Sequence, residues 1–534
     1  MRSANEIFIG FAIALALGSC GSKSKPTELS PSRSKVVFIG IDGATWDVMD
    51  PMLARGELPN IAKLIQRGSR APLISLPPFS SPVVWTTMAT GRFPRDHGIL
   101  GFTYPFSASK NARPVSSDMR HVPAIWNIAT KYGKRTGVIG YFVSHPPEQV
   151  DGFVVTDRFY QKIPGAVLPA NLLDVITPQL MDGPSRQEIL DRFLPWDYSP
   201  EAAKDPNAPH HKASLIVSGR VDDVVLRDEI YRKTSLGLMD QPVDLHMSYL
   251  RIVDHSSHST WRYFDGSGFK EAAEPENIKL LGDIIPEAYR YVDDFIGEVV
   301  ERCGEDTNLI IVSDHGFGPA TEDYEVTEGK GMVLSGSHRA DGILLAAGPD
   351  IINSSGDEID MIDIMDVAPL LMTLTGLPIS DELPGRIVSE ILRPGYLEQF
   401  PIERVSSYVI EKSIVKGRAV PEEAERDMLD MLANLGYIDD GLEAGDEDIA
   451  EDLTIWDVSH SARMLAIAGE LSHYVMRGSV EPARNLIELV RERDPRSAEL
   501  LSKHVRATLR GVAASIDLKM DTFTNSETLE SLGL

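Results

Sequence analysis

Four short stretches of the chain hold aspartate and histidine at spacings that suit metal binding. They are "KVVFIGID", "VDHSSHS", "SDHGF" and "SGSHRADG". Together they supply three carboxylates and three imidazoles, namely Asp42, Asp254, His258, Asp314, His315 and His338. Carboxylate oxygen combined with imidazole nitrogen suits zinc or manganese better than calcium. Six such ligands divide into two sites of three, and paired cations can clamp the attacking and leaving oxygens of a phosphoryl transfer.

Each stretch taken alone has a simpler interpretation. Asp254 could cap a helix, "SDHG" could be a strand end with its turn, and His338 could be a surface histidine. The ordered combination of the four stretches is what predicts a two-metal site.

A candidate nucleophile lies in "PPFSSPVVWTTMATG", from Pro77 to Gly91. Pro82 suits the first position of a helix, Ser81 then becomes the N-cap, and Gly91 ends the helix. Ser81 could serve only as a cap. The same position also places its hydroxyl at the positive end of the helix dipole, where a phosphate oxygen can be held. A bound metal would make that hydroxyl a nucleophile without a histidine base.

The elements that position these residues follow an alternating pattern. Apolar runs typical of buried strands cover 35–42, 135–142, 244–254, 308–316 and 342–349, and helical patterns such as 58–68 and 285–304 separate them. This alternation predicts an α/β fold with a large, mostly parallel sheet and helices on both faces. Ligands bind beyond the carboxyl ends of such strands, so the polar residues that end them should converge.

The motifs resemble those of the alkaline phosphatase superfamily, and most closely its type I phosphodiesterase/nucleotide pyrophosphatase branch. The resemblance spans roughly residues 35–394 and rests on "VFIGIDG", "SSPVVWTTMATGRFPRDHGI", "DHSSH", "SDHGF", "GSHRADGILLAAGP" and "DVAPLLMTLTGLP". It implies the superfamily's fold, two divalent metal ions, with zinc expected and manganese as the alternative, and a covalent serine intermediate that is then hydrolysed.

The resemblance also implies individual roles. The metal that activates the nucleophile would be bound by Asp42, Asp314 and His315. The second metal would be bound by Asp254, His258 and His338. The family's nucleophile, which also contacts the metal, lies ten residues before the glycine of a "TG" pair, and this position is Ser81 rather than Ser80.

Val84 departs from the family pattern. Nucleotide pyrophosphatases usually carry asparagine three residues after the nucleophile, where it holds a phosphate oxygen. With valine there, this contact must come from backbone N–H groups or another side chain, which makes nucleotide substrates doubtful. Val84 also stands where the sulfatase motif requires arginine, so sulfatase activity is not expected.

The N-terminus has the form of an export signal. Residues 1–20 contain Arg2, an apolar stretch too short to span a bilayer, and "LGSC", which resembles a bacterial lipobox with Cys20 as the lipidated residue. Residues 21–34 read as a tether. We therefore expect an exported protein that is lipid-anchored to a bacterial membrane. The only other cysteine is Cys303, so acylation of Cys20 would leave no disulfide within the chain.

The remaining organisation is read from changes in pattern. Residues 35–400 form the expected catalytic domain, with a specificity insertion at about 149–241, where the strand pattern weakens. Residues 401–534 read as a helical C-terminal region whose last helices, broken at Gly478, are reminiscent of a tetratricopeptide repeat, although a small helical bundle fits equally well. The net charge of -27 argues against nucleic acid as a partner.

The resulting hypothesis is an exported, metal-dependent phosphodiesterase that acts through Ser81 on a phosphoester of unknown identity. Two alternatives stay within the superfamily: a phosphomonoesterase, or a transferase of phospho-alcohol groups. A third is a surface scaffold that binds a protein partner through the C-terminal helices.

Overall fold

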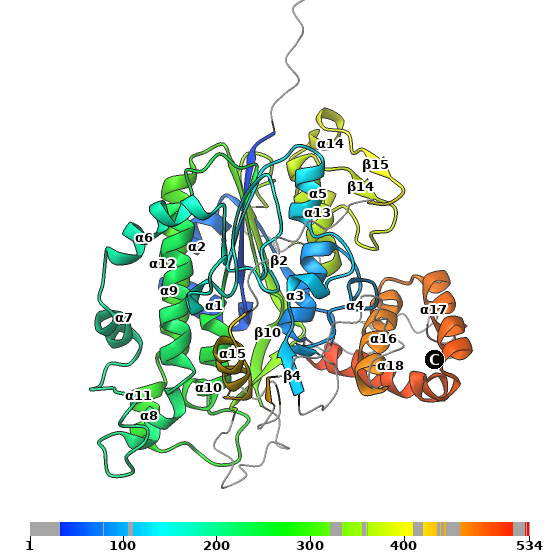
Figure 1. The fold of residues 1–534 in the computed structure, drawn as a ribbon. Coiled ribbons are helices and arrows are strands. Elements are labelled where there is room, and N and C mark those ends of the chain that lie inside the picture. Colours follow the sequence, from blue (N-terminus) through cyan, green and yellow to red (C-terminus); the bar gives the residue numbers. More distant parts are fainter. Residues whose placement is uncertain are drawn as a thin grey trace, which may run out of the picture. The chain divides into compact units, whose positions relative to one another are not determined.

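A nine-stranded mixed sheet runs through the fold (Figure 1), and the strand order makes β1 (Lys35–Ile41) its middle strand. The strand order is β13–β2–β12–β9–β1–β8–β5–β6–β7. The other strands are β2 (Gly68–Ile74), β5 (Thr136–Ile139), β6 (Gly152–Val155), β7 (Val167–Leu168), β8 (Leu245–Leu250), β9 (Thr307–Val312), β12 (Asp341–Ala347) and β13 (Ile362–Asp363). Parallel pairing prevails, with β12 and β7 as the antiparallel strands. The predicted α/β class with a mostly parallel sheet is confirmed.

This computed structural model describes residues 33–77, 79–104, 111–320, 334–354, 359, 361–408, 420–434, 438, 443–444, 460–515, 529 and 531–532. The expected signal peptide, Cys20 and nearly all of the expected tether lie outside these residues. Within them, no helix combines the length and the apolar character needed to cross a membrane.

Alternation along β1 divides the apolar interior into two cores. Val37, Ile39 and Ile41 face one core, while Val36 and Phe38 face the other. Because successive side chains of a strand point to opposite faces, a strand that is apolar at every position must be covered on both sides. The unbroken apolar run at 35–41 is therefore the sequence signature of a central strand.

Helices cover both faces of the sheet (Figure 1). On the first face lie α1 (Trp46–Ala54), α2 (Pro59–Ile65), α9 (Val221–Gly237), α10 (Ile252–Phe264) and α12 (Ile284–Cys303). On the second face lie α3 (Ser81–Thr90), α5 (Ile125–Lys131) and α13 (Val367–Thr375). The helices expected at 58–68 and 285–304 are α2 and α12.

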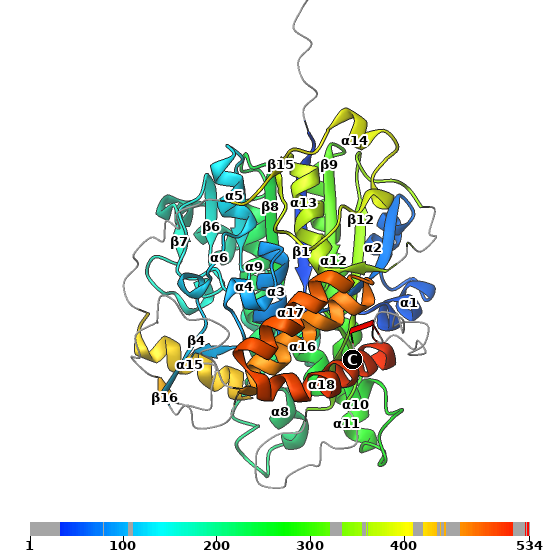
Figure 2. The same ribbon diagram turned by 90° about the vertical axis from the view of Figure 1, so that its right-hand side faces the viewer.

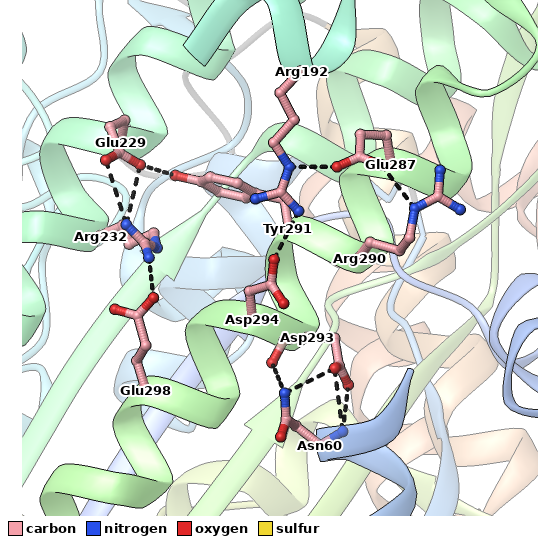
Figure 3. A network of polar contacts seen from close by, with 10 residues as sticks. All are labelled: Asn60, Arg192, Glu229, Arg232, Glu287, Arg290, Tyr291, Asp293, Asp294 and Glu298. Atoms are coloured by element: carbon pink, nitrogen blue, oxygen red, sulfur yellow. Dashed lines mark hydrogen bonds and ion pairs between the residues drawn. The ribbon is translucent and has the colours of Figure 1, made fainter. Parts of the chain in front are cut away.

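Polar contacts tie α12 to its neighbours on the first face (Figure 3). Asp293 is buried and accepts hydrogen bonds from the backbone N–H groups of Asn60 and Ile61, in the first turn of α2. Tyr291 donates to Glu229 of α9 at 2.8 Å. Arg192 of α7 (Arg186–Phe193) pairs with Asp294 at 2.8 Å. The contact between Tyr291 and Glu229 holds α9 against α12, and α9 also carries Asp228, which contacts the start of α10.

Residues 149–241 do more than the expected insertion. They supply two strands of the main sheet, β6 and β7, before the chain turns helical in α6 (Leu173–Met181), α7, α8 (His211–Val217) and α9. Short strands explain the weak sequence pattern, because four and two residues are too few to show a clear period.

The C-terminal region is mainly helical, as predicted, in α15 (Glu422–Asn434), α16 (His460–Met476), α17 (Val480–Arg493) and α18 (Pro495–Ser515). It also contains the two-residue strands β15 (Arg404–Val405) and β16 (Glu443–Ala444). The break at Gly478 is present, since Gly478 has φ 63° between α16 and α17.

Helix α16 packs beside α4 (Pro94–His97) (Figure 2). Its buried Glu470 accepts hydrogen bonds from Arg95 at 3.0 and 3.1 Å. Its His473 meets Asp363 at 2.8 Å. Both contacts lie on the second face of the sheet, so this surface of the C-terminal helices has its partner within the same chain.

The remaining elements are small. The hairpin of β10 (Gly316–Pro319) and β11 (Gly336–Arg339) follows β9. Other short elements are β3 (Thr103–Tyr104), β4 (Asn111–Pro114), α11 (Pro275–Leu281), β14 (Ile379–Ser380) and α14 (Tyr396–Gln399).

Candidate active site

The candidate site lies at the carboxyl ends of β1, β8 and β9, three adjacent parallel strands. Asp42 directly follows β1, and Asp314 and His315 follow β9. Because these strands run in the same direction side by side, residues more than 250 positions apart reach the same edge of the sheet. This is the convergence that the sequence predicted.

Asp254 and His258 reach the site from a helix rather than from a strand. The strand expected at 244–254 ends at Leu250, and α10 begins at Ile252. The buried Asp228 accepts hydrogen bonds from the backbone N–H groups of Arg251 and Ile252, both at 2.7 Å, and so stabilises the start of the helix. Positions four residues apart share one helix face, so Asp254 and His258 point the same way.

His338 comes from the β10–β11 hairpin, where it pairs with Phe317. The ring of Phe317 lies 4.7 Å from that of His258 and 5.2 Å from that of His338, measured between centroids. The hairpin thereby packs His338 against α10.

All six predicted ligands converge. His315 Nε2 lies 3.2 Å from Asp42 Oδ1 and 3.5 Å from Asp314 Oδ2. His338 Nε2 lies 3.2 Å from Asp254 Oδ1. His258 Nε2 lies 3.4 Å from that oxygen and 2.8 Å from His338 Nε2. The two groups adjoin, because His315 Nε2 is also 3.9 Å from Asp254 Oδ1. Two overlapping triads emerge as geometric candidates for holding a cation: Asp42, Asp314 and His315, and Asp254, His315 and His338.

The backbone orients all three histidines in the same way. Nδ1 of His258 contacts the carbonyl of Gly336 at 3.2 Å, Nδ1 of His315 that of Gly316 at 3.0 Å, and Nδ1 of His338 that of Phe79 at 2.8 Å. A carbonyl only accepts, so each ring carries a proton on Nδ1 and points Nε2 into the site, where Nε2 can bind a cation once it holds no proton of its own. Carbonyl partners of this kind are typical of histidines that bind metals.

The electrostatics of the cluster call for a positive charge. Burial, together with the charge of Asp42, raises the pKa of Asp314 well above its usual range. Burial also opposes ionisation of Asp254, but the facing His258 and His338 hold its pKa well below the usual range. Three buried carboxylates at this spacing repel one another unless a cation or proton lies between them.

Unsatisfied atoms mark the same place. The buried side-chain atoms without a hydrogen-bond partner in the described residues include Asp42 Oδ1, Asp314 Oδ2 and His315 Nε2. Buried polar atoms are rarely left in this state, and these three are the ligand atoms of one triad. The donor set of carboxylate oxygens and imidazole nitrogens therefore fits divalent zinc or manganese.

Ser81 lies at the start of α3, one residue away from the expected cap position. The N-cap is Ser80, which makes no side-chain capping bond, and Ser81 is the first helical residue. Gly91 ends the helix in the left-handed region, with φ 66°, as predicted. Ser81 is 2% exposed and lines the same pocket as Asp42 and Asp254. Its hydroxyl is thus not needed as a cap.

The helix N-terminus offers fewer N–H groups than the sequence suggested. Pro82 has none, and the N–H groups of Val83 and Val84 both donate to the carbonyl of Ser80 at 2.9 Å. Val84 itself is completely buried in the second core. Neither the side chain nor the backbone N–H of Val84 can therefore make the phosphate contact for which the family uses asparagine.

Arg251 is a cation within the pocket. Asp42, Ser81 and Asp254 are among the residues that line this pocket. The Arg251 guanidinium lies 4.7 Å from the ring centroid of Tyr249 and 5.0 Å from that of Phe142, and the residue is 7% exposed. In the described part of the chain, no hydrogen bond or salt bridge reaches this guanidinium.

The acidic neighbours of Arg251 are engaged elsewhere. Asp157 accepts hydrogen bonds from the backbone N–H groups of Val143 and His145, and Asp228 accepts those at the start of α10. A buried guanidinium with five donors and no acceptor is costly, so this arrangement favours an anionic ligand.

Sequence reasoning missed Tyr249 and Arg251. Tyr249 donates a hydrogen bond to Asp42 and packs on Trp85, with 4.8 Å between ring centroids. The signal was present, because "YLRIVDH" places a lone arginine in an apolar run directly before the predicted ligand Asp254. The rest of the pocket lining comes from distant segments, for which the sequence gives no such signal.

Comparison with known proteins places this site in context. The sequence model of the type I phosphodiesterase/nucleotide pyrophosphatase family matches residues 36–355. A search of curated protein sequences gives no significant match. Among solved structures, murine ectonucleotide pyrophosphatase/phosphodiesterase 5, in an inactive variant bound to AMP, is 14% identical, with a TM-score of 0.40, and the alignment covers 67% of this chain and 100% of that one. The human protein is 13% identical, with a TM-score of 0.39 and the same coverage.

Proposed function

Because the chain belongs to the type I phosphodiesterase/nucleotide pyrophosphatase family, we propose that it hydrolyses phosphodiesters with Ser81 as the nucleophile and two divalent cations as cofactors. The family match supports a hydrolase of the phosphodiesterase/pyrophosphatase type. The observation that carries the finer proposal is the meeting of three carboxylates and three Nε2 atoms beside a buried serine hydroxyl.

Two sets of residues would hold the cations. Asp42, Asp314 and His315 would bind the one next to Ser81. Asp254, His258 and His338 would bind the other, and His315 lies close enough to contribute to both. Cations bound there would lower the pKa of the Ser81 hydroxyl and offset the negative charge of the phosphoryl oxygens.

The chain's own residues supply the rest of the reaction. Ser81 Oγ loses its proton and attacks phosphorus, the bond from phosphorus to the first alcohol breaks, and the departing alkoxide takes up a proton. Water then cleaves the bond between phosphorus and Ser81 Oγ, which restores the hydroxyl and releases a phosphomonoester.

Arg251 takes the role for which the family uses asparagine. Its guanidinium lies in the pocket, is buried, and makes no hydrogen bond or salt bridge to another side chain in the described part of the chain. A guanidinium binds phosphate oxygens in a two-pronged contact and supplies a full charge where an amide supplies a dipole. The aromatic rings of Tyr249 and Phe142 hold it in position.

The test compares a diester with a monoester, using soluble protein that begins near Lys35 and is loaded with zinc or manganese. Bis-p-nitrophenyl phosphate should be hydrolysed, Ser81→Ala should lose this activity, and Ser80→Ala should keep most of it. Preference for p-nitrophenyl phosphate would indicate the phosphomonoesterase alternative. No turnover of either ester would leave the transferase or scaffold alternatives and overturn the proposed hydrolysis.

We also propose export and lipid anchoring through Cys20, on the N-terminal sequence pattern alone. Metabolic labelling with a fatty acid should mark the full-length protein, and Cys20→Ala should abolish the label. Labelling that persists in that variant would rule out Cys20 as the acylated residue.

A further inference from the structure

Helix α15 contributes to the active-site pocket although it lies outside the segment matched by the family. The match ends at residue 355, and α15 covers Glu422–Asn434. Met428, Met431 and Leu432 of this helix line the same pocket as Asp42, Ser81 and Asp254. We call these three side chains the α15 wall. They are 7%, 9% and 1% exposed, so they are buried except toward the pocket.

Specific contacts hold α15 in this position. Gln161 Nε2 donates to the carbonyl of Ala424 at 2.7 Å, and the Tyr160 hydroxyl contacts the sulfur of Met428 at 3.6 Å. The Arg227 guanidinium contacts the sulfur of Met431 and lies 4.2 Å from the ring centroid of Tyr160. Residues of the region 149–241 therefore seat the helix, and two distant parts of the chain complete one pocket.

The pocket lining is of two kinds. The polar and charged lining consists of Asp42, Ser81, Asp157, Arg227, Arg251, Asp254 and His255. The apolar and aromatic lining consists of Phe102, Phe142, Tyr160, Met428, Met431 and Leu432. Phe102 also packs in one apolar cluster with the α15 wall. Apolar side chains that border a pocket favour a ligand group that leaves water, and the flexible thioether of methionine adapts to groups of different shape.

Building on the proposed hydrolysis, we infer that the α15 wall selects phosphoesters with an apolar alcohol group. The group bonded to the phosphoryl centre would lie against Met428, Met431 and Leu432, while the phosphoryl oxygens face the metal ligands and Arg251. Burial of one methylene contributes about 0.8 kcal/mol, which corresponds to about a fourfold gain in affinity.

Alkylphosphonates test this inference, because each has one phosphonate and one carbon group and all carry the same charge. Their inhibition constants against bis-p-nitrophenyl phosphate would be measured from methyl to butyl, with phenylphosphonate as an aromatic arm. In the wild type, the inhibition constant should fall about fourfold for each added methylene. A stronger effect of phenylphosphonate than of butylphosphonate would assign the wall to aromatic alcohols.

Variants of the α15 wall show whether it causes this gradient. Met428→Ala and Leu432→Ala should each weaken butylphosphonate by about five- to tenfold and change methylphosphonate less than about twofold. An unchanged value for methylphosphonate also shows that the variant is folded. Met181→Ala, which makes the same change at a methionine that is 84% exposed, should leave the series unchanged.

Two results would overturn the inference: equal inhibition across the series in the wild type, or a gradient that survives in both α15 variants. Failure of the proposed hydrolysis looks different, since bis-p-nitrophenyl phosphate would then not be cleaved at all. In that case the unfolding temperature of the metal-loaded protein would be measured with each phosphonate, and the increase that each one causes should follow the same gradient.

Discussion

Replacement of Arg251 by methionine should separate catalysis from stability. Methionine keeps most of the side-chain volume but removes the charge and all five donors. If Arg251 binds the substrate phosphate, the variant loses a charge-assisted hydrogen-bonding contact that normally contributes about 1.5–3 kcal/mol. This corresponds to a fall of about 10- to 160-fold in kcat/KM for bis-p-nitrophenyl phosphate.

The effect on folding should not follow this loss. In the free protein the guanidinium is buried against the rings of Tyr249 and Phe142, and the buried Asp157 and Asp228 attract its charge. Burial of a charged group costs several kcal/mol, and these attractions offset that cost. The variant should therefore unfold at a urea concentration close to that of the wild type.

The assay pairs steady-state kinetics with urea unfolding. Arg251→Lys should recover part of kcat/KM, because it restores the charge but not the two-pronged geometry. Arg220→Met is the matched control: Arg220 is also buried, but its guanidinium donates to the carbonyl of Ile216 at 3.1 Å and it does not line the pocket. It should keep kcat/KM. The reasoning fails if Arg251→Met keeps full kcat/KM.

Three further predictions concern the metal site, the body of the fold and the response to acid. Removal of metal by chelators should lower the unfolding temperature. Zinc or manganese at about 100 times its Kd should raise the free energy of unfolding by about 2.7 kcal/mol, and Asp314→Asn should abolish this gain. Equal unfolding with and without metal would contradict the site. Asp293→Ala should lower the free energy of unfolding in urea by about 1–3 kcal/mol, because it leaves the N–H groups of α2 without acceptors. The control Asp294→Ala, at an exposed neighbour, should lower it by less than about 1 kcal/mol. Equal losses would contradict the role of the contacts between α12 and α2. Burial lowers the pKa of His246 to about 3, so between pH 6.5 and pH 3 the unfolded chain binds a proton at this residue and the folded protein does not. The free energy of unfolding should therefore fall from pH 6.5 toward pH 3 by an amount on the order of 4 kcal/mol, and His246→Gln should reduce this fall.

The convergence of the proposed metal ligands was predictable from the order of their motifs along the chain. Asp42 and Asp314 end apolar runs that can only be buried strands, and parallel strands bring their carboxyl ends together. Asp254 and His258 were found for a different reason. The strand was expected to continue to Asp254, and the helix start at Ile252 depends on Asp228, a residue 24 positions earlier that no local pattern connects to it.

The pocket was not predictable in the same way. Val84 showed that a phosphate contact was missing, but the sequence could not show that the N–H groups of Val83 and Val84 are already bonded to Ser80. The α15 wall depends on contacts between residues more than 200 positions apart, such as Gln161 with Ala424. Such contacts follow from how the elements pack rather than from the period of any one element.

The residues that the sequence predicted and those that it did not lie in different parts of the chain, which bears on the origin of substrate specificity. The proposed ligands, the proposed nucleophile Ser81 and the strands that hold them fall within the segment matched by the family. The groups that face the rest of the substrate come from α9, from loops at the edge of the sheet and from α15, which lies outside that segment. A change in α15 can therefore alter the alcohol that the pocket accepts without moving a metal ligand. By contrast, a change at Tyr249 would affect both, because this residue contacts Asp42 on one side and Arg251 on the other.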